Sequence, residues 1–573
     1  MSISLGSGAA EEKFPLLAPN DDAASVFTCD GTVDFCSRPA VRARTGRWAA
    51  CIFIIGYEII DRLAYFGIVA NLVLYIQDEL HQGTVSATKN VNYFKGATLV
   101  LPILGAFLAD SYLGKFRTIA YLSAFYVVGL VMLTLSASLA SLKPDTCASA
   151  SSCPDATSLQ LGFFYTSLYL IAIGTAGVKP CLEAFGADQF DEGHPIERKD
   201  KSSFFNWWYS VLLIGIHNHL GTPLYRNKIP GGSSIAVILH VLVAAARKWR
   251  VRVPHDHLLL YNVQDAGSPR MERKQLAHTS GFRCLDKAAT VWQAREEASV
   301  DSDSFTSHSE SRDGSVNPWK LCTVTQVEEV KLIFRMIPIW VTTIVHGLVT
   351  AQTETFFVQQ AATMDRKVGH YLTIPAASML TFASIAILVM LPIYDWVLIP
   401  VARCLTGCER GITLLQRLGV GYFLAIVCIG TAALVERRRL QVAVEYGLED
   451  DPSATIPMSI LWLLPQFIMY GVADVFALVG EQEFFYSQMP DSMRTLGMSL
   501  YLCGNGLSNY LSNALISVVA VVTSGGGNEG WISDNLNGSH LDYFYWLLAG
   551  ILALNLAAFL AMSRSHTYKA VGV

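Results

Sequence analysis

Residues 48 to 76 form an apolar segment long enough to cross a bilayer, yet three charges lie in its middle. About 20 apolar residues suffice for a transmembrane helix. Glu58, Asp61 and Arg62 would each cost roughly 2.5–3.5 kcal/mol at the bilayer centre if unpaired. Their spacing places them on one helix face, which Tyr65 continues, so they can pair. That face must look into protein or water, either as an ion-paired packing seam or as a proton or substrate pathway.

The composition fits a chain with many such segments. Of its 573 residues, 52% are hydrophobic and only 16% are charged, which is typical of a polytopic membrane protein. The net charge of −5 indicates no nucleic-acid partner. The 12 cysteines have no metal-ligand spacing, so we expect no metal. Catalytic triads, metal clusters and phosphate loops do not accompany the membrane charges, so we predict that the chain is not an enzyme.

The first half of the chain shows four clear spans, at 48–76, 92–112, 117–142 and 159–185. The fourth carries Lys179 beside Pro180, about a dozen residues before its polar end. A lysine near a span end often reaches towards the headgroups, but this position is deeper and favours a site in the interior. Arg42, Arg44 and Arg47 precede the first span and indicate a cytoplasmic N-terminus. The preceding tail has the form of an acidic dileucine sorting signal, with Glu12, Leu16 and Leu17.

The middle of the chain is less regular. Residues 203–223 offer one crossing at best, and the apolar run 235–246 is better read as an interfacial helix. Many basic residues and a Ser/Asp-rich tract at 301–316 then indicate a cytoplasmic linker, partly disordered, on which kinases could act.

The second half predicts six further spans, near 331–352, 371–399, 412–435, 457–481, 495–522 and 542–563. The loop 523–541 has no Lys or Arg and is expected outside, where its sequon makes Asn537 a glycosylation candidate. Arg437 to Arg439 fall on the outer side against the charge rule, though acidic residues surround them. The predicted domains are a disordered cytoplasmic tail (1–47), an incomplete N-terminal bundle (48–223), the linker (224–330), a six-span C-terminal bundle (331–563) and a cytoplasmic tail (564–573).

Several motifs appear in order along the chain: Glu58-x-x-Asp61-Arg62, a Phe163 to Lys179-Pro180 segment, Phe185 to Asp191, Ser202 to Tyr209, and Glu483 to Pro490. On these residues the chain resembles the plant nitrate and peptide transporter family, the proton-dependent oligopeptide transporters of the major facilitator superfamily. The resemblance extends over nearly the whole chain after residue 40.

Three departures from the family pattern stand out. The second acid of the first-span motif is Asp61 rather than Glu. After Tyr209 the chain passes within about 15 residues to Leu224, which resembles sequence beyond the sixth span, so the fifth span is shortened and the sixth is missing. Thr350 stands where one branch of the family has a nitrate-associated histidine, and His346 lies one helical turn earlier.

The resemblance implies an all-α major facilitator fold of two helical bundles, with about 11 spans here. It implies a proton-coupled symporter of small nitrogenous or anionic solutes, such as nitrate or di- and tripeptides, working by alternating access without a cofactor. The alternative is a transport-defective isoform or a sensor that lacks the sixth span. We expect a multi-pass protein of the plasma membrane or the vacuolar membrane.

The expected site combines acids and bases. Proton coupling is assigned to Glu58, Asp61, Arg62, Lys179 and Glu483. Substrate binding is assigned to Arg62, Tyr65, Lys179, Gln352, Thr353, Phe357 and Glu483, with ordinary span packing as the alternative for the uncharged positions. Glu481 and Glu483 point in nearly opposite directions on a helix, so only one faces the cavity, and the motif favours Glu483.

Overall fold

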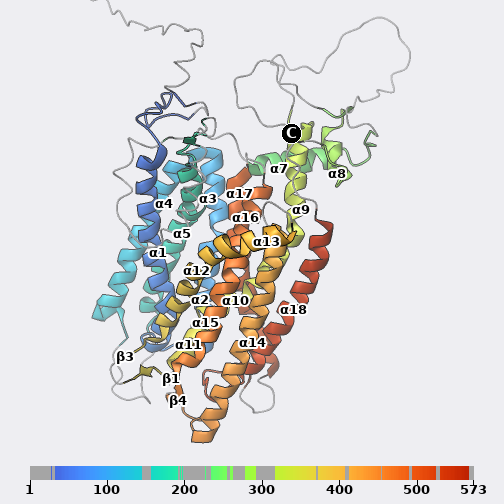
Figure 1. The fold of residues 1–573 in the computed structure, drawn as a ribbon. Coiled ribbons are helices and arrows are strands. Elements are labelled where there is room, and N and C mark those ends of the chain that lie inside the picture. Colours follow the sequence, from blue (N-terminus) through green and yellow to red (C-terminus); the bar gives the residue numbers. More distant parts are fainter. Residues whose placement is uncertain are drawn as a thin grey trace, which may run out of the picture. The chain divides into compact units, whose positions relative to one another are not determined.

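The computed structural model describes residues 27–28, 32–144, 156–191, 194, 196–197, 200, 226, 234–254, 259–261, 276, 278–291, 317–369, 372–406, 412–452, 454–489, 493–523 and 530–566. Long helices dominate these residues (Figure 1). The helices of the first half are α1 (Arg47–Asp78), α2 (Thr84–Val100), α3 (Pro102–Leu108), the π-helix η1 (Ala109–Leu113), α4 (Lys115–Ser138), the 3₁₀ turn η2 (Ala140–Leu142) and α5 (Ser158–Ala187).

The linker contributes α7 (Ser234–Arg247), α8 (Arg283–Asp286) and the 3₁₀ turn η5 (Lys287–Ala289). The second half contains α9 (Val324–His346), α10 (Leu348–Thr353), α11 (Phe356–Ala362), η6 (Ala376–Ser378), α12 (Met379–Ile393), η7 (Tyr394–Leu398), α13 (Ile399–Thr406), α14 (Leu414–Tyr446), η8 (Ile460–Leu463), α15 (Leu464–Phe476), α16 (Leu478–Gln488), α17 (Arg494–Thr523) and α18 (Leu541–Ser565). Short strands form two small pairs: β1 (Met364–Asp365) runs parallel to β4 (Ile456–Ser459), and β2 (Lys367–Val368) antiparallel to β3 (Leu372–Thr373).

Ten helical stretches in the described part of the chain are long and apolar enough to cross a membrane. Four precede the linker and six follow it, as the sequence predicts. The predicted remnant at 203–223 and the serine tract at 301–316 lie outside the described residues. The second span is the one whose start is most displaced, since it begins at Thr84 rather than near residue 92. Its first turns are polar, and their side chains are buried against other helices instead of facing lipid.

The described residues divide into two compact units: Met1–Asp61 with Glu183–Ile229, and Arg62–Leu182 with Pro230–Val573. In the first unit, Arg42 forms ion pairs with Asp191 (2.8 Å) and Glu197 (3.5 Å). Arg226, fully buried, pairs with Glu197 at 2.7 Å. Residues before the first span, after the fourth and at the start of the linker therefore lie on one side of the membrane. This agrees with an even number of crossings before the linker.

In the second unit, helices of the two halves of the chain pack closely. α17 of the second half lies against α2 of the first. Gly506 and Gly96 permit this approach, because a Cβ on Gly506 would lie 3.0 Å from the Gly96 carbonyl oxygen. Asn92 donates to Asn513 across the contact at 3.0 Å. Elsewhere in the second half, α14 packs against α15 and α18, and α12 packs against α15.

The start of α14 and its extension beyond the predicted end at residue 435 have local causes. Thr413 and Gln416 form a capping box at its N-terminus. At the other end, Arg439 is completely buried and binds Glu436 at 2.6 Å, so its charge is neutralised within the helix. The three arginines that contradict the charge rule thus include one that is internally paired.

The prediction that Asn537 carries a glycan is contradicted by its packing. The side chain is only 2% exposed. Its amide nitrogen donates to the carbonyls of Asp451 (2.9 Å) and Ala454 (3.2 Å), and its oxygen accepts from Arg439 at 2.8 Å. A glycan on this nitrogen is incompatible with these contacts. The sequon instead closes the loop against the end of α14.

Candidate functional site

The charged face of the first span lies on a continuous helix, as predicted. α1 contains Glu58, Asp61, Arg62 and Tyr65 without interruption. Asp61 is 3% exposed, and Tyr65 is also buried. The two acids belong to one compact unit and Arg62 to the other, so their pairing stays a prediction.

Two predicted residues of the first half meet directly. The Lys179 ammonium on α5 lies 3.9 Å from the ring centroid of Tyr65 on α1, a cation–π contact. The Tyr65 hydroxyl is hydrogen-bonded to Thr98 of α2 at 3.2 Å. Thr98 in turn donates to the Lys95 carbonyl, one turn away. Three helices of the first half therefore converge on Lys179, Tyr65 and Lys95.

Lys95 connects this group to the second half of the chain. It is 3% exposed and forms an ion pair with Glu354. Glu354 lies between α10 and α11, where the helical stretch Val324–Ala362 is interrupted. Thr355, which follows it, has φ −121° and ψ −92°, outside helical geometry. Interrupted helices in transporters occur where backbone and side chains line a solute or ion site.

A second carboxylate of the second half lies near this ion pair. Asp474 on α15 is within electrostatic range of Tyr470, Glu354 and Lys95. Tyr470 also contacts Thr350. We call Tyr65, Lys95, Lys179, Glu354, Tyr470 and Asp474 the central polar cluster.

The other predicted site residues of the span Val324–Ala362 are packed against protein rather than exposed to a cavity. Gln352 is fully buried and donates to Ser512 at 3.1 Å, while Thr353 donates to the Val349 carbonyl. Phe357 stacks edge to face on Phe467 and Tyr545. The packing alternative fits Phe357 best. Their assignment to substrate binding stays a prediction.

The two glutamates on α16 differ in burial. Glu481 is completely buried and accepts a hydrogen bond from Tyr422 at 3.1 Å. The Glu483 side chain is 45% exposed and pairs with Arg417 at 3.1 Å. The ring of His346 stacks on Tyr422 at 4.5 Å, so His346 belongs to the Glu481 group. That Glu483 is the acid that faces the cavity, and that it takes part in proton coupling, both stay predictions.

Lys95, Glu354 and Asp474 were missed from the sequence, and Glu481 was set aside in favour of Glu483. Each is a single charge within or beside an apolar run, the same signal that identified Asp61 and Lys179. Lys95 lies within the predicted span 92–112 but was not singled out there. Glu354 escaped because it lies just beyond the predicted end at residue 352.

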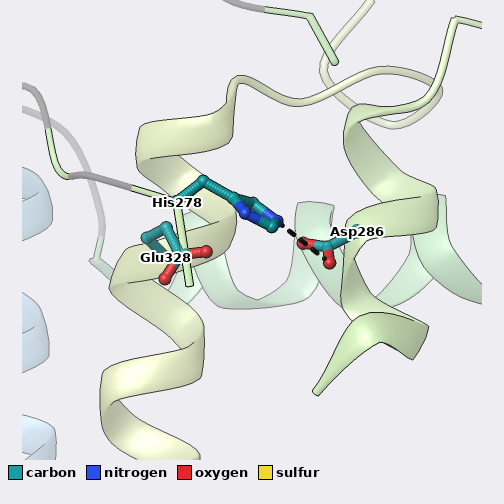
Figure 2. A group of neighbouring side chains, drawn as sticks. All are labelled: His278, Asp286 and Glu328. Carbon is teal, nitrogen blue, oxygen red and sulfur yellow. Dashed lines mark hydrogen bonds and ion pairs between the residues drawn. The ribbon is translucent and has the colours of Figure 1, made fainter. Parts of the chain in front are cut away.

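A third charged group lies in the linker rather than among the spans. Figure 2 shows His278, Asp286 and Glu328 together, with potential ligand atoms within 4.8 Å of one another. Lys331 lies between the two carboxylates, 2.6 Å from Asp286 and 2.8 Å from Glu328. Its ammonium supplies the positive charge that a metal ion would bring. We call these four residues the linker cluster.

Opposite charges enclosed among spans from both halves of the chain define a class of protein: a polytopic membrane protein with a central ionisable site, as in secondary transporters. A sequence profile described as the POT family matches residues 116–216 and 210–532. The chain belongs to the POT family.

Curated relatives match over almost the whole chain. Protein NRT1/ PTR FAMILY 8.3 of Arabidopsis thaliana is 43% identical, with 95% of this chain and 96% of the relative covered. Protein NRT1/ PTR FAMILY 8.1 of the same plant is 42% identical, with 96% and 99% covered. The two matched segments of the family profile meet at residues 210–216, where the sequence departs from the family pattern.

Solved structures confirm the predicted fold. The POT family transporter PepTSo, described in a crystal structure obtained in meso, superposes with a TM-score of 0.58 at 19% identity, covering 90% of this chain and 98% of that chain. A peptide transporter POT in complex with sulfate gives 0.57 at 12% identity, covering 92% and 99%. The chain therefore has the major facilitator fold and is an integral multi-pass membrane protein.

Proposed function

We propose that this chain is a proton-coupled symporter of small nitrogenous or anionic solutes, such as nitrate or di- and tripeptides, working by alternating access. The observation that carries the proposal is the central polar cluster. Its cations, Lys95 and Lys179, come from the first half of the chain, and its carboxylates, Glu354 and Asp474, come from the second. A site divided in this way is sensitive to relative movement of the two halves.

The residue types suit a solute that carries an anionic group. Buried ammonium groups bind nitrate or a peptide carboxylate through charge-assisted hydrogen bonds. The carboxylates can bind a proton or the amine of a peptide. One solved POT family transporter is described in complex with 5-aminolevulinic acid, which carries both groups. The same pairing of charges supports a mixed-charge solute here.

Coupling follows from competition for the lysines. A proton on Glu354 removes its charge, and Lys95 is then available to the anionic group of the solute. Release of the proton restores the ion pair and displaces the solute. The same exchange is expected of Glu58, Asp61 and Glu483 with Arg62 and Lys179. Since an unpaired buried charge is costly, half-loaded states, in which only the proton or only the solute is bound, are disfavoured.

The test is uptake by the purified full-length chain in proteoliposomes, with labelled dipeptide and labelled nitrate as separate solutes. We expect accumulation when the outside is acidic, and its loss when a protonophore collapses the gradient. Lys179→Gln and Glu58→Gln should abolish accumulation while the protein stays monodisperse. Lys367→Gln, on the exposed strand β2, is the matched control and should transport normally.

Other results would change the proposal in defined ways. Uptake that ignores the proton gradient would make the chain a facilitator and remove the coupling. Normal accumulation by Lys179→Gln would remove the central polar cluster from the mechanism. A wild-type chain that is folded but moves neither solute would favour the transport-defective alternative.

A further inference from the structure

The described part of the linker separates its charges. Its carboxylates, Asp286, Glu328 and Glu329, are 1%, 2% and 3% exposed. Asp286 and Glu328 turn inward to Lys331 in the linker cluster (Figure 2), and Glu328 also accepts from Thr279 at 2.6 Å. The exposed charges on the same described residues are all positive: Arg247, Arg250, Arg252, Arg283 and Lys320.

Two of these exposed arginines each contact an exposed tryptophan. Arg247 donates to the Trp319 carbonyl at 3.4 Å, and the Arg250 guanidinium lies 4.6 Å from the ring centroid of Trp249. Trp249 is 65% exposed and Trp319 is 41% exposed. We call Arg247, Trp249, Arg250 and Trp319 the basic-aromatic patch.

The patch continues the outward side of α7. Val241 and Ala244 of this helix are buried in the linker core together with Leu285 and Val327. Leu239, 47% exposed, lies on the opposite side, and Arg247 in the last turn is also exposed. The helix therefore has an exposed apolar residue on its outer side, with exposed arginine and tryptophan at and just after its C-terminal end, a combination typical of helices lying at a membrane surface.

The position of α7 along the length of α9 and α17 indicates what contacts its exposed side. Val237 and Ile238 pack against the apolar cluster that contains Met336 of α9 and Leu496 of α17. Met336 lies shortly after Lys331, where the apolar part of α9 begins, and Leu496 lies in the first turn of α17. In Figure 1, α7 and α8 lie beside the end of α9 rather than beyond it. α7 therefore lies beside the end of the candidate span Val324–Ala362.

We propose that the basic-aromatic patch binds anionic phospholipid headgroups of the cytoplasmic leaflet. Arginine pairs with a phosphate or carboxylate oxygen, and tryptophan is enriched at the boundary between headgroups and acyl chains. The acids among the described residues of the linker are buried and add no exposed negative charge to the patch. The linker then holds α7, and with it the ends of α9 and α17, against the membrane surface.

The test uses the full-length chain in nanodiscs of phosphatidylcholine containing a fixed fraction of either brominated phosphatidylserine or brominated phosphatidylcholine. Bromine quenches nearby tryptophans, so enrichment of the anionic lipid appears as extra quenching at equal bromine content. We expect this excess for the wild type, and we expect Trp249→Phe with Trp319→Phe to remove it.

Removing arginine charges inside and outside the patch distinguishes binding at the patch from a general attraction of anionic lipid to the protein. Arg247→Gln with Arg250→Gln should lower the affinity for the anionic lipid about 25-fold, because each basic residue near an anionic surface is worth about fivefold. Arg437→Gln with Arg438→Gln removes two exposed arginines from the far end of α14 and should leave the excess unchanged. Equal quenching by the two lipids, or an excess that survives the Arg247 and Arg250 changes, would overturn the proposal. Displacement by added inorganic phosphate would assign a soluble anion instead.

Discussion

Two groups of charges in this protein are each centred on a buried lysine, and they differ in how fully that lysine is bound. In the linker cluster, the three N–H groups of Lys331 have three acceptors: Asp286 (2.6 Å), Glu328 (2.8 Å) and the Thr279 carbonyl (2.9 Å). In the central polar cluster, Lys95 makes an ion pair with Glu354, whose side chain remains 14% exposed, and a second acid, Asp474, lies near.

The difference separates structural from exchangeable charge. A lysine whose donors are all used gains nothing from a new partner, and disrupting it leaves buried carboxylates uncompensated. Lys95 is paired with Glu354 and has Asp474 nearby, so the proton and the charges of this group can be arranged in more than one way. The first arrangement fixes a shape, whereas the second can respond to a proton or an anionic solute.

The largest effect is expected on removing the linker lysine. Lys331→Met should destabilise the linker by about 3–5 kcal/mol, because Asp286 and Glu328 lose their cation while buried. Limited proteolysis of the purified chain should show new cleavage between residues 278 and 324, with a lower melting temperature. Lys367→Met is the exposed control. A protease-resistant Lys331→Met linker would show that the carboxylates are satisfied in another way.

The next effect concerns the ion pair between the two halves. Lys95→Glu and Glu354→Lys should each reduce acid-driven uptake by about tenfold or more, since a difference of about 1.4 kcal/mol corresponds to tenfold. The double exchange should restore part of the uptake, because it re-forms an ion pair in reversed polarity. Uptake is measured with monodisperse protein at equal levels. If the double variant is no better than the single ones, the positions matter for reasons other than their pairing.

A smaller effect is expected at the neighbouring acid. Asp474→Asn keeps the shape of the side chain but removes one negative charge near Lys95. We expect uptake to fall by about threefold to tenfold, less than for either partner of the ion pair. Asp365→Asn, on the short strand β1, is the control. A loss as large as that of Glu354→Lys would make Asp474 the principal carboxylate.

Much of the fold followed from apolar length and charge alone. The ten described spans, the continuous first helix with Asp61 and the interior position of Lys179 were predicted, because a buried charge in an apolar segment has few alternatives. The fold class came from the motif resemblance and is confirmed by the solved relatives. The sorting signal at Glu12, Leu16 and Leu17 lies outside the described residues and stays a prediction.

Predictions that needed tertiary contacts were less successful. Glu483 and Glu481 are equally compatible with the sequence, and only the packing of Tyr422 shows which is enclosed. Lys95 lies inside the predicted second span, but the sequence does not show that it pairs with Glu354 of the second half. The polar side chains of Asn92 and Thr88 are buried against α17 and α11. The sequon at Asn537 carried no information about the contacts that bury its amide nitrogen.

The smallest expected effect tests the linker through its cysteines. Cys322 is 1% exposed, and burial raises the pKa of its thiol to about 11, although nearby Lys248 opposes the shift. The thiolate is the reactive form, so Cys322 should be inert to N-ethylmaleimide at neutral pH and gain reactivity only as the pH approaches 11. Cys284 on α8 is exposed and should be labelled at neutral pH. Peptide mass spectrometry distinguishes the two sites.

In Lys331→Met, opening of the linker should make Cys322 reactive at neutral pH. Labelling of Cys322 in the folded wild type would instead show that the linker core opens without loss of its lysine.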